Sequence, residues 1–312
     1  MLWLGNDMQM NCKKTIPIFL ILLFPLFTFG QKEHWRQFPF EWEGDSLSGK
    51  YFDKVAISVK VNVDHHPFYF QLDLGANYSI IYGNCIKDIP SLYQQRISLN
   101  DQFRDHQLFQ LKDLKFKLGD YVAENFKLFG IADYGSFLDA HEKIQCGSVG
   151  ADLFQNKIMI IDFPDKTVYV TDSLNKQEVS AFDFIPASVK NHFLIIPVTI
   201  NGKVYQLMYD TGSSIFTMVT TKEIAGEFAD TARITDELNV TNLGDTLKVK
   251  GIKCAYTIAI GKEKSNNQMI WFTENDYFSL NQKPYDGIIG NALFFNRKIC
   301  LDFKNKRFGI AR

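Results

Sequence analysis

The chain has little net charge and no long run of one sign. Its 34 Lys and Arg residues nearly balance its 35 Asp and Glu residues, so the formal net charge is −1 at pH 7. A protein that binds a polyanion needs clustered positive charge, because contacts with phosphate dominate that affinity. The sequence has no such cluster, and we therefore expect no nucleic-acid partner.

The apolar run near the N-terminus is too short to cross a membrane as a helix. It covers residues 16–29, follows two lysines, and falls short of the ~20 residues that a span requires. Small residues, Thr28 and Gly30, then stand where a signal peptidase would cut. We expect residues 1–30 to be a cleaved signal peptide and not a stable membrane anchor. The mature protein is then exported, either to a periplasm or out of the cell.

Cysteine is scarce: the chain has five, and one of these precedes the expected cleavage site. The four that remain are Cys85, Cys146, Cys254 and Cys300. An even number in an exported chain permits two disulfides, so one bridge in each half is one interpretation and free buried thiols are the other. No Cys-x-x-Cys pair or Cys/His spacing indicates a metal site. We expect no metal and no cofactor.

Aromatic residues, in contrast, are abundant, with 28 Phe and 13 Tyr in the chain. Together with Val, Ile and Thr in short alternating runs, they favour strands over helices. Residues 55–63 alternate and then reverse into residues 68–72. Residues 193–200 and 203–209 repeat this pattern around Asn201-Gly202, which is a strong hairpin signal. The sequence therefore predicts an all-β protein.

Two segments at the ends of these hairpins are similar, and each carries an aspartate. The first contains Asp73-Leu74-Gly75-Ala76, and the second contains Asp210-Thr211-Gly212-Ser213. Each is followed, at similar spacing, by a second shared segment, at residues 147–154 and at residues 287–294. Two halves that each bring one acid to a Gly-containing turn predict a paired-carboxylate site, and paired carboxylates perform acid–base chemistry.

The repeat divides the mature chain into two similar lobes, residues 50–170 and residues 191–312. Between them, residues 171–190 begin with a polar segment that lacks apolar periodicity, and we interpret them as a linker. Residues 31–49 contain several aromatic residues and are interpreted as an N-terminal arm that packs on a lobe. Because both lobes lie in one chain, we expect a monomer.

The two aspartate segments resemble those of the pepsin-like and retropepsin-like aspartic peptidases. The resemblance covers nearly all of residues 50–312, and Asp210-Thr211-Gly212-Ser213 is the closer match. It implies two β-barrel-like lobes of acid-protease type with a cleft between them. Asp73 and Asp210 would be the catalytic pair across that cleft. The residues implied to support the pair are Gly75, Thr211, Gly212 and Ser213, of which the two glycines permit the turns to approach.

This resemblance implies an exported endopeptidase that hydrolyses peptide bonds in a peptide or protein substrate. Two carboxylates about 3 Å apart cannot both ionise cheaply, so the pair would share one proton. The charged member would take a proton from a water that attacks the peptide carbonyl. The protonated member would hydrogen-bond the carbonyl oxygen as charge develops there.

The first half departs from the family's pattern. Leu74 stands where the family has Thr or Ser, whose hydroxyl links the two turns; losing such a hydrogen bond costs about 1 kcal/mol. Ala76 replaces a hydroxyl that would favour the ionised carboxylate, so we expect a raised pKa for the pair. No flap residue is identifiable between residues 97 and 116. The alternative function is a catalytically retired protein that keeps the fold and serves as a peptide-binding or scaffold module.

Overall fold

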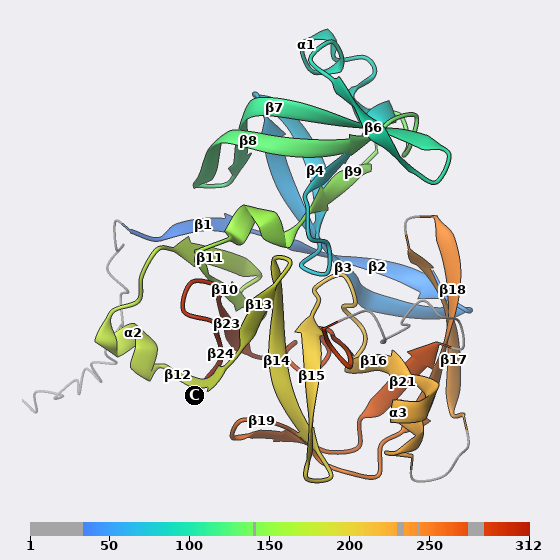
Figure 1. Cartoon of the computed structure of the whole chain (residues 1–312), viewed down its shortest axis with the longest axis vertical. Helices are drawn as coiled ribbons and strands as arrows, with labels where there is room; N and C mark the ends of the chain where they lie inside the picture. The colour runs from blue at the N-terminus through green and yellow to red at the C-terminus, as the bar shows by residue number, and fades with distance from the viewer. Residues whose placement is uncertain (1–33, 140–141, 230–233, 243, 274–283) are drawn as a thin grey trace, which may run out of the picture. The chain divides into compact units, whose positions relative to one another are not determined.

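The computed structural model describes residues 34–139, 142–229, 234–242, 244–273 and 284–312 (Figure 1). Residues 34–312 form one compact unit. The expected signal peptide, residues 1–30, lies outside the described residues. Within the described part of the chain, no helix has the length and apolar character needed to cross a membrane.

The all-β prediction is confirmed, because strands in three sheets make up most of the regular structure (Figure 1). The first sheet contains, in spatial order, β2 (Glu41–Leu47), β3 (Lys50–Val63), β4 (His66–Leu72), β9 (Gln145–Val149), β5 (Ile80–Tyr82), β8 (Tyr121–Ile131), β7 (His106–Leu118) and β6 (Ile97–Phe103). The second contains β17 (Asp236–Asn242), β18 (Asp245–Lys253), β21 (Met269–Thr273), β16 (Met218–Thr221), β22 (Gly287–Ile289), β15 (Lys203–Tyr209), β14 (Phe193–Ile200), β19 (Ile258–Ile260) and β20 (Glu263–Ser265), with β13 (Ser188–Lys190) beside β14.

The third sheet contains β1 (Arg36–Pro39), β11 (Thr167–Thr171), β10 (Ile158–Asp162), β23 (Lys298–Asp302), β24 (Arg307–Ala311) and β12 (Phe182–Pro186). The helices are short: η1 (Gly83–Ile86), α1 (Pro90–Tyr93), η2 (Ala151–Phe154), α2 (Lys176–Ser180) and α3 (Lys222–Gly226).

The first two sheets repeat one pattern of strand pairing. In the first sheet, β4 is parallel to β9, β9 is antiparallel to β5, and β5 is parallel to β8. In the second sheet, β15, β22, β16 and β21 are related in the same way. Each pattern begins with an antiparallel hairpin, β3–β4 or β14–β15. The repeat in the sequence is therefore also a repeat in the fold, and we call the two units the first and second copies.

The predicted hairpins form where the alternating runs place them. β14 and β15 span Phe193–Ile200 and Lys203–Tyr209, as expected. Asn201 and Gly202 connect them with φ angles of 50° and 75°. Both positive angles fit the tight turn whose twist matches that of the strands, and Asn and Gly adopt them at low cost.

The barrel-like lobes implied by the resemblance are not seen, because no sheet of the described residues closes into a barrel. β3 also pairs with β7 at residues 61–63, but β2 and β6 remain edge strands of the first sheet. The second sheet likewise ends in β17 and β20. The terminal hairpins of the two copies instead share the third sheet, in which β10 pairs antiparallel with β23.

An aspartate closes the turn of each terminal hairpin. Asp162 Oδ1 accepts the Asp165 N–H at 3.2 Å, and Asp302 Oδ1 accepts the Asn305 N–H at 2.8 Å. Asp302 is fully buried, and its Oδ2 also accepts from Arg307 Nε at 2.6 Å. Asp162 and Asp302 therefore have the same structural role, which is to hold the turn of a terminal hairpin, and they are not part of the paired-carboxylate site.

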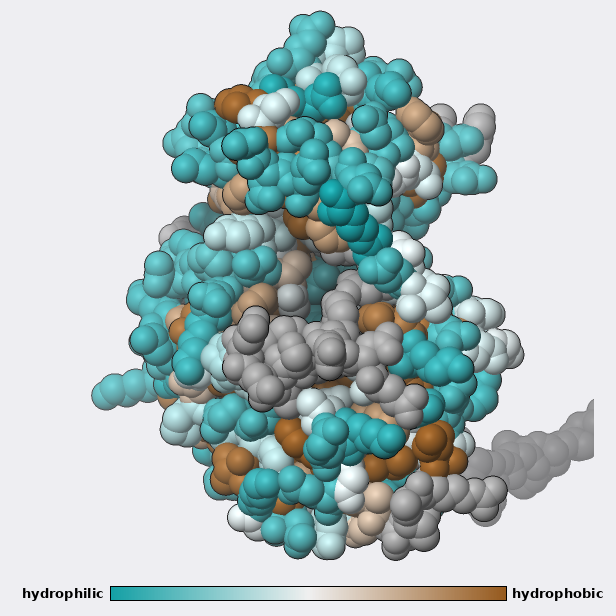
Figure 2. Space-filling model, turned by 45° about the vertical axis from the view of Figure 1, so that its right-hand side comes forward, coloured by the Kyte–Doolittle hydropathy of each residue, from teal (hydrophilic) through white to brown (hydrophobic). Residues whose placement is uncertain are grey.

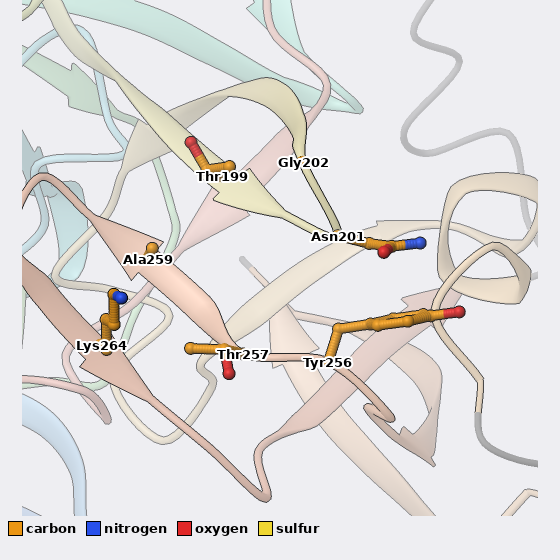
Figure 3. Close-up of a pocket in the computed structure, with 7 residues that line it drawn as sticks. All are labelled: Thr199, Asn201, Gly202, Tyr256, Thr257, Ala259 and Lys264. Atoms are coloured by element: carbon orange, nitrogen blue, oxygen red, sulfur yellow. The ribbon is translucent and has the colours of Figure 1, made fainter.

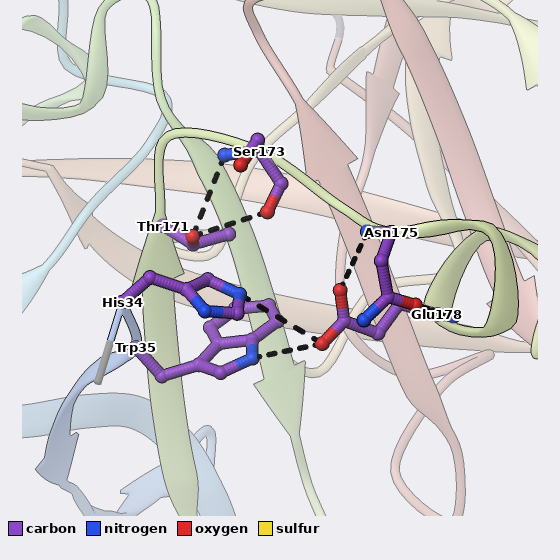
Figure 4. A network of polar contacts seen from close by, with 6 residues as sticks. All are labelled: His34, Trp35, Thr171, Ser173, Asn175 and Glu178. Atoms are coloured by element: carbon purple, nitrogen blue, oxygen red, sulfur yellow. Dashed lines mark hydrogen bonds and ion pairs between the residues drawn. The ribbon is translucent and has the colours of Figure 1, made fainter. Parts of the chain in front are cut away.

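The N-terminal arm packs on the third sheet. β1 pairs with β11, and Phe38 is buried there. Trp35 Nε1 donates to Glu178 Oε1 at 3.1 Å, while Glu178 and Asn175 form a capping box at the start of α2 (Figure 4). Residues 171–190, interpreted from the sequence as a linker, therefore contain regular structure, since β12 also pairs with β24.

Among the described residues on the face shown in Figure 2, no broad apolar interface is visible. Hydrophilic residues cover most of that face, and hydrophobic residues lie in small separate patches. Single exposed apolar residues are normal on a protein surface, whereas a docking surface is usually contiguous.

We predict that Asp302→Ala lowers the free energy of unfolding by about 3 kcal/mol, because it leaves Arg307 without its buried carboxylate partner. Equilibrium unfolding in denaturant measures the change. Asp183→Ala is the control: its partly exposed carboxylate pairs with Lys262 and Arg312, and its loss should change stability little. Equal effects of the two substitutions would contradict the structural role of Asp302.

Candidate active site

The hairpin of each copy delivers its aspartate to the same kind of turn. Asp73 follows β4, and Asp210 follows β15. The Asp73 N–H donates to Val149 O at 3.0 Å, and the Asp210 N–H donates to Ile289 O at 3.0 Å. Val149 ends β9 and Ile289 ends β22, so the parallel strand beside each hairpin fixes the position of its aspartate. The two segments that recur in the sequence thus meet their aspartates in space.

The carboxyl groups of Asp73 and Asp210 lie side by side, because both border the place that a Cβ atom at Gly212 would occupy. The turns cross so closely that each glycine faces the opposite carboxyl group. A Cβ atom at Gly75 would lie 2.4 Å from Asp210 Cγ, and one at Gly212 would lie 2.7 Å from Asp73 Oδ1. Any side chain at either position would therefore push the pair apart, which is the physical reason for glycine in both turns.

The two carboxyl groups have unequal surroundings. Burial raises the pKa of Asp73 well above its usual range, and the charge of Asp210 and the hydrogen bond to it raise this pKa further. Asp73 retains some exposed surface, but protein atoms surround its carboxyl group densely. Asp210 accepts the Gly212 N–H at 2.7 Å and the Ser213 hydroxyl at 2.7 Å. Asp73 therefore favours its protonated form, while Asp210 is held by two hydrogen-bond donors.

Ser213 accounts for part of the difference between the surroundings of the two carboxyl groups. Ala76 occupies the equivalent place in the first copy and has no hydroxyl. Asp73 Oδ1 accepts the Gly75 N–H at 3.0 Å, and backbone hydrogen bonds from Gly75 and Ala76 lower the Asp73 pKa without offsetting burial. A side-chain hydroxyl donor is thus present at Asp210 and missing at Asp73.

Thr211 links the two turns through its buried hydroxyl. The Leu74 N–H donates to Thr211 Oγ1 at 2.9 Å, and the Thr211 hydroxyl donates to Leu72 O at 2.7 Å. Leu74 holds the equivalent position in the other turn, is 1% exposed, and packs in the main hydrophobic core. Leu74 has no hydroxyl and cannot form the equivalent hydrogen bond to the second turn. Its apolar packing takes the place of that bond in the first turn.

Two polar residues that sequence reasoning did not select support the turns. Asn291 Nδ2 donates to Thr211 O at 3.2 Å and to Ser214 Oγ at 2.9 Å. Asp152 Oδ1 accepts the Ser79 hydroxyl at 2.8 Å. Both lie in the recurring segments after the shared glycine, where a polar residue in an otherwise apolar motif was the available signal.

Tyr82 lies near Asp73 and was also not predicted. Burial raises the pKa of the Tyr82 hydroxyl, and the charges of Tyr134 and Asp73 raise it further. The rings of Tyr82 and Tyr134 pack edge to face with centroids 5.0 Å apart. Of this aromatic pair, Tyr82 is the member that lies near Asp73.

One hairpin from each copy projects so that the two hairpins touch. In the first copy, β6 and β7 form the hairpin in the region where a flap was expected, and Arg104 lies in its turn. Arg104 forms an ion pair with Asp245, at the start of β18, with atoms 2.5 Å apart. Both side chains are substantially exposed, at 37% and 66%. The β6–β7 and β17–β18 hairpins are therefore joined by a solvated contact.

A second candidate ligand site lies elsewhere in the molecule. A pocket of about 310 Å³ lies at the turn end of the β14–β15 hairpin, with Tyr256 and Lys264 among its lining residues (Figure 3). Asp210 follows the opposite end of β15, so this pocket is separate from the carboxyl pair. In the part of the chain that the structure describes, no group of His, Cys, Asp and Glu could hold a metal ion.

No protein-family model matches the chain, and a comparison with curated proteins finds no match either. The functional interpretation therefore depends on the geometry of the two turns and on the residues that carry the resemblance.

We predict that Thr211→Val, which keeps the side-chain volume, lowers the free energy of unfolding by about 2 kcal/mol. The substitution removes the hydroxyl that bonds to the buried Leu74 N–H and the Leu72 carbonyl. Leaving a buried polar group without a partner costs more free energy than a hydrogen bond normally contributes to stability. Denaturant unfolding measures the loss. Ser213→Ala, at a less buried hydroxyl, is the control and should cost less. Unchanged stability of Thr211→Val would refute the link between the turns.

Proposed function

We propose that this protein is an exported aspartic endopeptidase that uses Asp73 and Asp210 to activate a water molecule. The observation that carries the proposal is the direct contact of the two carboxyl groups, in which Asp73 favours the proton and Asp210 is oriented by Gly212 and Ser213. The resemblance of both turns to those of pepsin-like and retropepsin-like peptidases supports the same assignment. Thr211, Gly75 and Gly212 act by holding the turns together.

The chemistry follows from the unequal protonation of the pair. Ionised Asp210 removes a proton from water as the water oxygen attacks the peptide carbonyl carbon. The proton on Asp73 hydrogen-bonds the carbonyl oxygen and passes to it as negative charge develops. When the tetrahedral intermediate collapses, the amide nitrogen takes the proton from Asp210 and Asp73 recovers its own. The pair returns to its starting state with one proton.

In this proposal the two copies are the lobes of an acid protease, and a peptide or protein substrate lies between them. The matched strand pairing in the two sheets supports such a duplicated architecture. The contact between Arg104 and Asp245 suits hairpins that separate to admit a substrate, because an exposed ion pair contributes at most about 1 kcal/mol. Because one chain contains both lobes, a monomer would supply both aspartates of the pair.

A peptide-binding or scaffold protein without catalysis is the second candidate function, and Leu74 is the observation that favours it. The hydroxyl link between the turns runs from Thr211 alone. A one-sided link lets the carboxyl pair loosen while the surrounding sheets remain folded. Such a protein would retain peptide binding between the copies and lose the ability to position water.

We predict that the mature protein cleaves internal bonds in a mixed peptide library incubated between about pH 3 and pH 8. Asp210→Asn should reduce the rate by about 10²-fold or more, because it removes the general base. A statine-type inhibitor should also block cleavage by the wild type. Asp183→Asn, remote from the pair, is the matched control and should cleave as the wild type does. Mass spectrometry of the products measures the rate and the bonds cut.

Two outcomes would oppose the proposal. If the folded protein binds peptides but cleaves none of them at any pH, the result would favour a peptide-binding or scaffold protein without catalysis. Cleavage that is fastest below about pH 3 would contradict the raised pKa of Asp73, since a pair with a persistent shared proton remains active at less acidic pH.

A further inference from the structure

The four cysteines of the mature chain are free and buried in this structure, so the interpretation with one bridge in each half is not seen. They are not equivalent, however. Cys85 and Cys146 both belong to the first copy and both lie in the main hydrophobic core. Cys254 lies in the same core but comes from the second copy, where it donates to Tyr256 O at 3.2 Å, and Cys300 is buried in β23 of the third sheet. The first two therefore require separate consideration.

The strand pairing brings Cys85 and Cys146 together. β5 pairs antiparallel with β9, with Ile81 opposite Gly147. Cys146 directly precedes Gly147 in β9, and Cys85 lies in η1, which follows β5 without a break. The chain therefore returns Cys85 toward Cys146, and the two thiols lie close enough for Cys85 to raise the pKa of Cys146.

The surroundings of the two thiols fit a sulfur pair. Each sulfur also contacts a backbone carbonyl, Cys85 with Ser136 O at 3.3 Å and Cys146 with Ile144 O at 3.6 Å. No cluster of His, Cys, Asp or Glu among the described residues completes a metal site around them. The two cysteines are 1% and 0% exposed, which shields them from solutes once the protein is folded.

We propose that Cys85 and Cys146 form a disulfide when the chain folds in an oxidising compartment. The proposal relies on the expected export of the chain and not on the proposed peptidase activity. The oxidant is a disulfide, either that of a thiol–disulfide oxidase or oxidised glutathione. One cysteine thiolate attacks this disulfide and forms a mixed disulfide, and the other thiolate then displaces the remaining thiol. Two protein thiols lose two protons and two electrons, and the oxidant is reduced to two thiols.

The reaction belongs to folding and not to the folded state. Only the thiolate attacks a disulfide, and the hydrogen bond to Cys85 together with burial raises the pKa of the Cys146 thiol. In the unfolded chain both thiols are solvated and have their ordinary reactivity. The folded dithiol should thus oxidise slowly, and the folded disulfide should resist reduction.

A bridge at this place would stabilise the strand that holds Asp73. β9 runs from Cys146 to Val149, and Val149 O accepts the Asp73 N–H at 3.0 Å. The bridge would also close a long loop that contains β6, β7 and β8, and closing a long loop restricts the unfolded chain strongly. Oxidation in the first copy would therefore support the side of the site on which Leu74 provides no hydroxyl link.

The test uses the full mature chain, refolded from denaturant with oxidised glutathione and, in parallel, with a reductant. The products are denatured, their free thiols are alkylated, and the peptides are mapped by mass spectrometry. We expect a cross-linked Cys85–Cys146 peptide only after oxidative refolding, with Cys254 and Cys300 alkylated in both samples. The oxidised protein should melt on the order of 5 °C or more above the reduced one. Native reduced protein given the same oxidant should form the bridge far more slowly.

Matched variants separate this bridge from a general effect of the reductant. Cys254→Ala should keep the redox-dependent melting shift, and Cys146→Ala should lose it. The mapping itself uses the wild-type protein and so does not depend on whether a variant folds. Alkylated Cys85 and Cys146 after oxidative refolding, or a bridge that includes Cys254 or Cys300, would overturn the proposal.

Discussion

The contact between the carboxyl groups of Asp73 and Asp210 is the constraint on which the rest of this structure depends. Two acids from distant parts of the chain can share a buried place only if one remains protonated, because two adjacent negative charges repel strongly. Gly75 and Gly212 let the turns approach, and each glycine lies against the opposite carboxyl group. Ser213 donates to Asp210, while burial raises the pKa of Asp73. The fold thereby assigns the proton to one member of a pair that is nearly symmetric.

The two copies hold their aspartates alike but differ in the next residue, and this difference bears on both the proposed peptidase activity and the alternative of a peptide-binding protein without catalysis. Each copy supports its aspartate by the same bond to the parallel strand, through Val149 or Ile289. The copies differ at the residue after the aspartate, since Thr211 links both turns and Leu74 packs in the core. Leu74 replaces a directional hydrogen bond by apolar contact, which stabilises the fold without fixing the angle between the turns. Catalysis depends on that angle more than stability does.

Local signals in the sequence were sufficient for the hairpins and for the pairing of the acids. Asn201-Gly202 predicted its hairpin because few residues accept two positive φ angles. The repeated aspartate segments predicted that Asp73 and Asp210 would meet, since a duplicated unit with one acid in each copy places both at the common interface. The support from Asn291 could have been predicted from its place in the recurring apolar segment. Tyr82 could not, because its position depends on how β5 packs.

Long-range pairing was the part that the sequence did not reveal. Nothing in residues 158–162 and 298–302 shows that β10 and β23 lie side by side, since periodicity reports burial and not the partner. Residues 171–190 were interpreted as a linker because they begin with a polar segment that lacks apolar periodicity, yet β12 pairs at the edge of the third sheet, where half-exposed residues suffice. The proximity of Cys85 and Cys146 follows from the same kind of pairing, between β5 and β9. The sheets also remained open where barrels were expected, because closure depends on edge pairing between distant strands.

The most direct test is a pH titration of the ¹³C-labelled aspartate carboxyl carbons by NMR, with the wild type compared with Asp210→Asn. Our account predicts that Asp73 in the wild type keeps its proton well above the ordinary aspartate pKa of about 3.9. In the variant, the pKa of Asp73 should fall, because the neighbouring negative charge is gone while burial is unchanged. If Asp73 ionises near the ordinary value in both proteins, the two carboxyl groups do not share a proton and the account is wrong.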